Sequence, residues 1–163
     1  IKPSMINQAL KQNPRLPAAL RLPLQFTPVG LRNRLFITTI NRLLKQELID
    51  DELDFLQDKV VAIQVTDAAL QLRFTLKQQQ IKSCHQDCAA DLTIAGSAYD
   101  FLLLISRRED PDTLFFNRRL KLGGDTELGL YVKNFLDAME MTERWTMISK
   151  LSDRISRIAE KIS

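Results

Sequence analysis

One short segment of the chain holds several side chains of the types that bind metals. Cys84, His85, Asp87 and Cys88 lie close together there, and His85 is the only histidine. A closed zinc site needs about four convergent ligands, usually in two pairs that are roughly a dozen residues apart, and the sequence has no second pair. The order of residues also differs from the C-x-x-C-H pattern of haem attachment. We therefore expect an ordinary turn between strands here, without a metal or redox role.

The rest of the chain offers little for catalysis. A Ser or Cys nucleophile needs a nearby base, and His85 is the sole imidazole. No G-x-S-x-G elbow, Walker loop or G-x-G-x-x-G pattern occurs. The acidic stretch 50–58 lacks the EF-hand spacing, so it indicates a solvated linker, and Gly123–Asp125 indicates a strand-to-helix turn more than an anion site. We expect no enzyme, no catalytic residue and no cofactor.

Composition predicts a single soluble globular domain. The chain has 163 residues, of which 45% are hydrophobic and 26% charged, with only 5 Gly and 6 Pro. The longest strictly apolar run, residues 101–105, is far shorter than the roughly 20 residues of a membrane-spanning helix. Two cysteines and no export signal favour the cytoplasm. The first residue is Ile1, so we expect further residues upstream.

Charge is distributed unevenly along the chain. Residues 1–46 contain eight basic side chains and no acidic one, which gives +8, whereas the remainder holds 15 basic and 20 acidic groups, which gives −5. Five of the six prolines lie in the first 28 residues, where they restrict the backbone and discourage helix. These patterns predict a basic, proline-rich arm over residues 1–28 and one domain over residues 29–163.

Hydrophobic periodicity predicts an α+β domain. Helical spacing follows Pro28, and strict alternation then marks two strands that form an antiparallel hairpin. Ser97 and Asp100 form a capping box for a helix that is apolar nearly all round. The expected elements are a helix over 31–45, strands over 61–65, 70–76, 81–84 and 90–95, a helix over 97–106, a turn at 110–112, a strand over 120–122, a helix over 126–139 capped by Asp125 or Thr126, and a last amphipathic helix with Trp145, Ile148, Leu151, Ile155, Ile158 and Ile162 on one side. This order indicates a largely antiparallel sheet with helices on one face.

Large apolar side chains on several helices allow two interpretations. A packed core is the ordinary one. An apolar ligand cavity uses the same residue types, and two features favour it: the helix at 98–105 that is apolar on all sides, and the run Leu114-Phe115-Phe116 just after the expected turn.

The segment from Asp110 to Glu140, DPDTLFFNRRLKLGGDTELGLYVKNFLDAME, resembles the signature of sterol-carrier-protein-type lipid-binding domains. It is most similar to the branch of bacterial ubiquinone biosynthesis accessory factors, and weaker similarity extends over most of the domain and to residues 20–28. Many carrier domains have a glycine–lysine pair at the position of Asn117-Arg118-Arg119. The ubiquinone biosynthesis branch lacks this pair too, and its absence argues against a sterol ligand.

This resemblance implies a five-stranded sheet, an apolar tunnel and no catalytic residues. It further implies that the protein presents isoprenoid quinone intermediates, or binds phospholipid, in the oxygen-independent branch of ubiquinone biosynthesis with the partner proteins UbiU and UbiV. Together with the all-round apolar helix, it leads us to predict a lipid cavity lined by Phe36, Ile40, Leu102, Phe115, Phe116, Tyr131, Phe135 and Met139.

The basic arm and first helix suggest a membrane contact. Cations combined with large apolar side chains are typical of interfacial elements on anionic membranes, and we expect Arg15, Arg21, Arg32 and Arg34 to face such a surface, peripherally at the inner membrane. The apolar residues of this segment could equally pack on the domain. Nucleic-acid binding is the alternative, but Phe26 and Phe36 are the only aromatic residues there, too few for stacking on single strands, so we expect no nucleic-acid partner. A hydrolase or isomerase with an unrecognised site is a third hypothesis.

Overall fold

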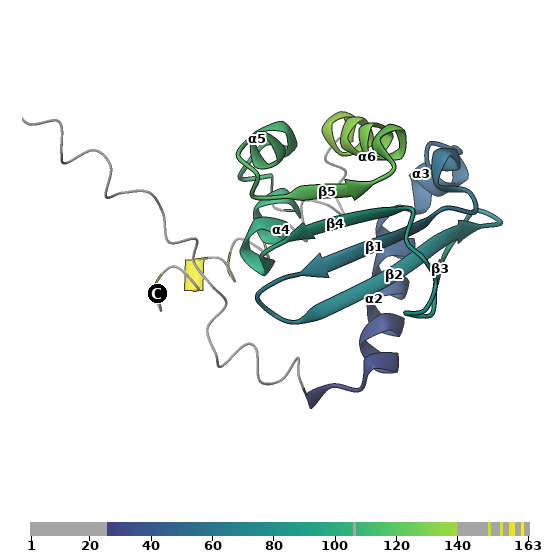
Figure 1. The fold of residues 1–163 in the computed structure, drawn as a ribbon, viewed down its shortest axis with the longest axis horizontal. Coiled ribbons are helices and arrows are strands. Elements are labelled where there is room, and N and C mark those ends of the chain that lie inside the picture. The colour runs from purple at the N-terminus through teal and green to yellow at the C-terminus, as the bar shows by residue number, and fades with distance from the viewer. Residues whose placement is uncertain are drawn as a thin grey trace, which may run out of the picture.

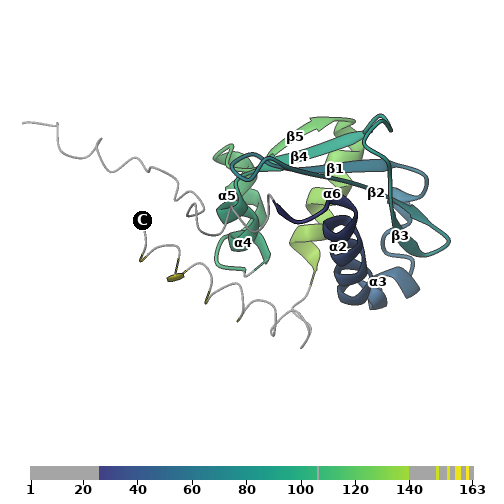
Figure 2. The same ribbon diagram turned by 90° about the horizontal axis from the view of Figure 1, so that it is seen from below.

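The computed structural model describes residues 26–105 and 107–139, together with residues 150, 154, 157, 158 and 161. In this part of the chain, helices and a five-stranded sheet form two layers (Figures 1 and 2). Arg15, Arg21 and nearly all of the expected last helix lie outside the described residues. The predictions that rest on them stay predictions.

The sheet has the strand order β3-β2-β1-β4-β5. Only β1 and β4 run parallel, and the other neighbouring pairs are antiparallel. The strands are β1 Val60–Val65, β2 Leu70–Lys77, β3 Gln80–Ser83, β4 Leu92–Gly96 and β5 Lys121–Gly124. The predicted hairpin, the largely antiparallel sheet and the α+β class are confirmed.

The helices lie together on one side of the sheet, as Figure 2 shows. They are α2 Val29–Leu43, α3 Lys45–Ile49, the short 3-10 helix η1 Asp54–Leu56, α4 Ala98–Ile105, α5 Pro111–Phe116 and α6 Thr126–Ala138. Because side chains alternate along a strand, Val61 and Ile63 of β1 face these helices, whereas Gln64 is exposed on the other side. The sheet is thus mixed but largely antiparallel, and the helices cover one of its faces.

The prediction of a simple turn at residues 110–112 is wrong, because helix α5 begins at Pro111. Proline is favoured at the first helical position, where its missing N–H is not needed. The Asp110 side chain accepts a hydrogen bond from the Thr113 backbone N–H at 3.1 Å and caps the helix. As a result Leu114 is completely buried, so the run 114–116 belongs to a helix that packs on the domain.

The predicted linker at 50–58 also has structure. Its acidic side chains Asp50, Asp51, Glu52 and Asp54 are exposed, as expected of a solvated stretch. However, Leu53 and Leu56 between them are buried in the core, and η1 begins within the segment. The stretch therefore anchors the start of β1 rather than leaving it loosely attached.

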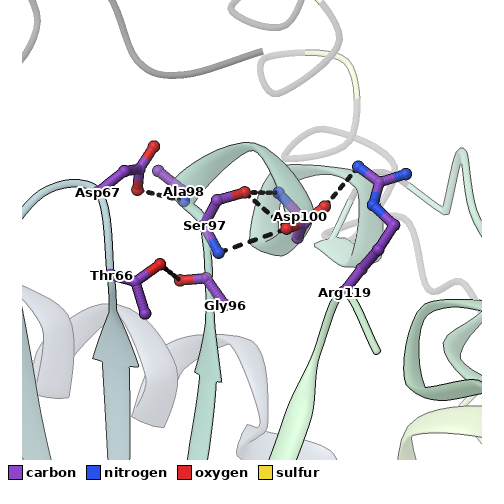
Figure 3. A network of polar contacts seen from close by, with 7 residues as sticks. All are labelled: Thr66, Asp67, Gly96, Ser97, Ala98, Asp100 and Arg119. Atoms are coloured by element: carbon purple, nitrogen blue, oxygen red, sulfur yellow. Dashed lines mark hydrogen bonds and ion pairs between the residues drawn. The ribbon is translucent and has the colours of Figure 1, made fainter. Parts of the chain in front are cut away.

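A polar network fixes α4 at the ends of β1 and β4 (Figure 3). The Ser97 hydroxyl accepts from the Asp100 backbone N–H at 3.1 Å and donates to the Asp100 carboxylate at 2.6 Å, which confirms the predicted capping box. Asp67 accepts from the Ala98 N–H at 2.8 Å. Asp100 is only 2% exposed, and its carboxylate forms an ion pair with Arg119. A buried charge is tolerated when it is paired and hydrogen-bonded in this way.

One asparagine of helix α2 forms hydrogen bonds to the sheet, beside the half-buried apolar residues of the helix that pack on the core. None of its residues, all of which are described, is fully buried. The Asn41 amide donates to the Ile81 carbonyl and accepts from the Ile81 N–H, both at 2.8 Å. Ile81 lies on β3, the edge strand, so the side chain occupies hydrogen-bonding groups that an additional strand would otherwise use.

We expect Asn41→Ala to lower the free energy of unfolding by about 1 kcal/mol, because two hydrogen bonds are lost while the edge groups of β3 can be rehydrated. Urea unfolding followed by circular dichroism measures the change. Thr39→Ala, at an exposed position of the same helix, is the control and should change the free energy by less than half as much. Equal effects of the two substitutions would contradict this role of Asn41.

Candidate functional site

Half-buried apolar side chains converge between the helices and the middle of the sheet. They come from α2, η1, β1, α4, β5 and α6, and each packs against the buried core without being fully covered. We call this set the apolar site: Phe36, Ile37, Ile40, Phe55, Ile63, Phe101, Ile105, Leu122, Phe135, Leu136 and Met139. Such a surface is suited to an apolar ligand and offers no reacting group.

Ile63 marks the centre of the apolar site. It lies in β1, the middle strand, and its side chain faces the helices. Its neighbours on that face are Val61, Val65, Leu72 and Ile94, and all four are buried. Ile63 alone among these five is only partly buried. Part of the Ile63 side chain thus stays accessible on the face of the sheet that the helices cover.

Two helices form opposite walls of the apolar site. α2 packs at β3, one edge of the sheet, and α6 packs at β5, the other edge. The Phe36 ring of α2 lies 6.2 Å from the Phe74 ring, centroid to centroid. On the α6 wall, the Phe55 ring lies 5.8 Å from that of Tyr131 and 6.2 Å from that of Phe135. Aromatic contacts at such distances are favourable, so they give both walls a defined shape.

The predicted lining residues fall into three groups. Phe36, Ile40, Phe135 and Met139 lie together in the apolar site. Tyr131 is 47% exposed, with its ring against Phe55. The other three residues are not among those packed against that core. Phe115 packs against a second cluster formed by Leu103, Leu114 and Leu120, Leu102 is half-buried outside both described clusters, and Phe116 is 88% exposed.

The second cluster is connected to the apolar site through Phe101, which packs against both. On the outer surface beside this cluster, Phe115, Phe116 and Lys133 border an open pocket of about 490 Å³. Lys133 also forms an ion pair with Asp112, which ties α5 to α6. The two phenylalanines therefore belong to a surface feature on α5 rather than to the space above Ile63.

Sequence reasoning missed part of the site. Ile63, Phe55 and Phe101 belong to it, but alternation and helical spacing mark every inward-facing residue alike and do not tell which stays partly open. The available signal for Phe101 was its place in the helix that is apolar all round. Phe55 lies in the acidic stretch, where its neighbours indicated a linker.

The cysteine segment lies away from the apolar site, between β3 and β4. Cys84 and Cys88, both in the described part, are half-buried free thiols. Among the described residues, no three His, Cys, Asp or Glu side chains gather closely enough to hold a metal ion. Burial, and next to it the neighbouring Cys88, raises the pKa of the Cys84 thiol.

The expected membrane-facing arginines differ in their surroundings. Arg34 is exposed on α2, whereas Arg32 is half-buried and engaged in interactions. Among the helices of the described part, none is long and apolar enough to cross a bilayer.

Comparison with known proteins agrees with this architecture. The profile of the SCP-2 sterol transfer family matches residues 38–137, which include the whole sheet and most of the apolar site but only the C-terminal part of α2. The chain belongs to the SCP-2 sterol transfer family. The resemblance predicted from residues 110–140 is thereby confirmed, and the match begins inside α2.

Within the SCP-2 family, the chain is similar to proteins named "Ubiquinone biosynthesis accessory factor UbiT". It is 40% identical over 127 residues to UbiT of Escherichia coli strain K12, which covers 78% of this chain and 72% of that protein. The UbiT protein of Escherichia coli O157:H7 matches to the same extent. A solved structure titled "UbiJ-SCP2 Ubiquinone synthesis protein" is 20% identical, covers 73% of this chain and 96% of its own, and has a TM-score of 0.50. That structure supports the SCP-2 fold alone.

We expect Cys84 to react slowly with iodoacetamide at neutral pH, because a raised pKa leaves little of the reactive thiolate. Its alkylation, followed by peptide mass spectrometry from pH 7 to 10, should continue to accelerate at pH values where the reaction of glutathione has levelled off. A Cys84 reaction as fast as that of glutathione at pH 7.5 would contradict the expectation.

Proposed function

We propose that the protein is a non-catalytic lipid-binding accessory factor in ubiquinone biosynthesis. Its apolar site holds the isoprenoid tail of a quinone precursor, with a phospholipid as the alternative cargo. The names of the UbiT relatives support the pathway, and the SCP-2 family supports the lipid. The predicted cavity is the space over Ile63, between the α2 and α6 walls.

The incomplete burial of Ile63 is the observation that carries this proposal. A residue at the centre of the covered face of a sheet is normally sealed by the helices above it. Here its four neighbours are buried and it is not, while apolar side chains from both walls surround it. An alkyl chain lying there would remove this apolar surface from water, at roughly 25 cal/mol per Å².

A non-catalytic role fits the surroundings of the buried Asp100. Asp100 serves as a helix cap and pairs with Arg119, so its carboxylate is engaged in structure. The cargo would therefore be presented to other proteins for its chemistry. In this proposal the pathway is the oxygen-independent one, and the partners are UbiU and UbiV.

Substitution inside the apolar site should remove the cargo. We expect the protein purified from its own host to carry a prenylated phenol, a quinone or a phospholipid in native mass spectrometry. Ile63→Trp should reduce the loaded fraction at least about fivefold, because an indole fills the space that the tail needs. Gln64→Trp, on the exposed face of the same strand, is the matched control and should keep the cargo.

Circular dichroism and thermal unfolding check that both variants fold. If Ile63→Trp destabilises the protein, Ile40→Trp on the α2 wall replaces it. An empty wild-type protein that also takes up no added prenylated lipid would contradict the proposal, and so would a folded Ile63→Trp variant with undiminished cargo.

The membrane contact predicted for the arm and first helix remains part of this proposal. On α2 and just before it, Leu31, Leu35 and Phe26 expose apolar surface, with Phe26 82% exposed. Arg34 is exposed beside them, and no acidic residue precedes Glu47. Apolar insertion together with cations is the combination that binds anionic interfaces.

We expect the triple variant Arg15→Glu, Arg21→Glu, Arg34→Glu to pellet with anionic vesicles several-fold less than wild type at 0.1 M salt. Each cation near such a surface contributes roughly 1 kcal/mol. The control, with the same change in net charge, is Lys59→Glu, Lys77→Glu, Lys121→Glu, whose three lysines are exposed outside α2. Equal pelleting of the two variants, or no pelleting of wild type, would argue against docking through this segment.

A further inference from the structure

One buried polar atom on the α2 wall lacks a partner. The Asn33 side-chain oxygen is inaccessible to solvent and finds no hydrogen-bond partner among the residues that the structure describes. Buried polar groups are nearly always hydrogen-bonded, and an unpaired one reduces stability. A specific reason for keeping an asparagine at this position is therefore required.

The position of Asn33 connects it to the apolar site. Residues three, four and seven positions apart share one face of a helix, and Asn33 precedes Phe36, Ile37 and Ile40 by these spacings. Those three residues pack toward the sheet in the apolar site. Asn33 thus continues the same stripe at the N-terminal end of α2, about 10 Å along the helix from Ile40.

Asn41 on the same helix shows what a structural asparagine looks like in this fold. Its oxygen accepts from the Ile81 N–H and its nitrogen donates to the Ile81 carbonyl. Both polar ends of Asn41 are therefore satisfied by the protein. The Asn33 oxygen has no such partner, although both side chains lie on the inner half of α2.

We propose that Asn33 recognises the polar end of the cargo by accepting a hydrogen bond from a hydroxyl group on its ring. This inference rests on the proposed function and deepens it, because it selects among lipid classes. An amide oxygen is an acceptor, so it pairs with a phenol or hydroquinone hydroxyl. A quinone carbonyl, an ester and an ionised phosphate can only accept, so they do not satisfy this oxygen, whereas the ammonium or hydroxyl of a phospholipid headgroup also donates. We commit to a prenylated phenol with its tail along Phe36 and Ile40, and phospholipid is the competing ligand in the test.

The experiment compares two ligands that differ in one group: a prenylated phenol and the same prenylated benzene without the hydroxyl. Native mass spectrometry titrations give both dissociation constants. Wild type should bind the phenol about tenfold more tightly than the hydrocarbon, the effect expected of one buried hydrogen bond. Asn33→Leu should bind both equally, with its affinity for the hydrocarbon unchanged or improved.

Two controls separate recognition from structure. Thr38→Leu, at an exposed position of α2, should keep the tenfold preference. In the ligand-free state, Asn33→Leu should unfold at the same or a higher temperature than wild type, because an unpaired buried amide is removed and leucine favours helix. A lower unfolding temperature would mean that the amide has a structural partner, which would overturn the inference.

The outcomes distinguish this inference from the function on which it rests. If wild type and Asn33→Leu bind prenylated ligands with the same preference, Asn33 does not read the hydroxyl, while lipid binding stands. If phospholipid binds to wild type and the phenol does not, the cargo class is wrong. If wild type binds neither of the two prenylated ligands and no phospholipid, the proposed function itself fails.

Discussion

The pairing of Asn41 with the backbone of Ile81 determines where one wall of the apolar site lies. A surface helix is usually held by a stripe of buried apolar residues, but α2 has none that is fully buried. Its inner face packs on the core through half-buried apolar residues such as Phe36 and Ile40, and two hydrogen bonds of Asn41 additionally fix it to the edge strand β3. Because this polar contact positions the helix, Phe36 and Ile40 can remain half-covered beside the sheet. Asn41 thus helps to hold the α2 wall in place, while Phe36 and Ile40 supply its apolar surface.

The opposite wall, α6, is held by its buried Leu128 and Val132 and, in addition, by polar contacts at its end and middle. The Arg107 guanidinium donates to the carbonyl groups of Leu136 and Met139 at the end of α6, where four carbonyl groups lack helical partners. The Lys133–Asp112 ion pair ties the middle of α6 to α5. Polar attachments at the periphery of both walls leave the apolar side chains between them free to contact a ligand. A domain selected only for stability would instead close its helices over Ile63, since buried apolar surface is the main source of stability.

Sequence patterns predicted the elements well wherever a local rule governs the backbone. Strict alternation located β1 and β2, and the Ser97–Asp100 and Asp125 caps form as expected, the latter by accepting from the Leu128 N–H at 3.0 Å. The pattern at Pro111 was misleading because proline is equally suited to a turn and to the first residue of a helix. Of the predicted lining residues, Phe36, Ile40, Phe135 and Met139 pack against the same buried core, and their contact with a lipid stays a prediction. Hydrophobic spacing could not identify Ile63, since partial exposure at the sheet centre depends on how far apart two helices are held, and that distance is set by Asn41 and other contacts between residues far apart in the sequence.

Asn33 and Asn41 show why residue type alone does not reveal such roles. On a helical wheel, both break an apolar stripe and suggest a solvated face. In the fold both point inward, and the difference between them is whether the protein supplies the partner. At Asn41 the Ile81 backbone on β3 supplies the partner, so this side chain attaches α2 to the edge of the sheet. At Asn33 no described residue does, so its buried side-chain oxygen is left without a hydrogen-bond partner from the protein. The unfavourable free energy of this unpaired oxygen is offset only when a ligand donates a hydrogen bond to it. Asn33 and Asn41 lie eight residues apart on the same helix, and only Asn41 finds its partners in the protein. This difference indicates that the ligand carries a hydrogen-bond donor beside Asn33.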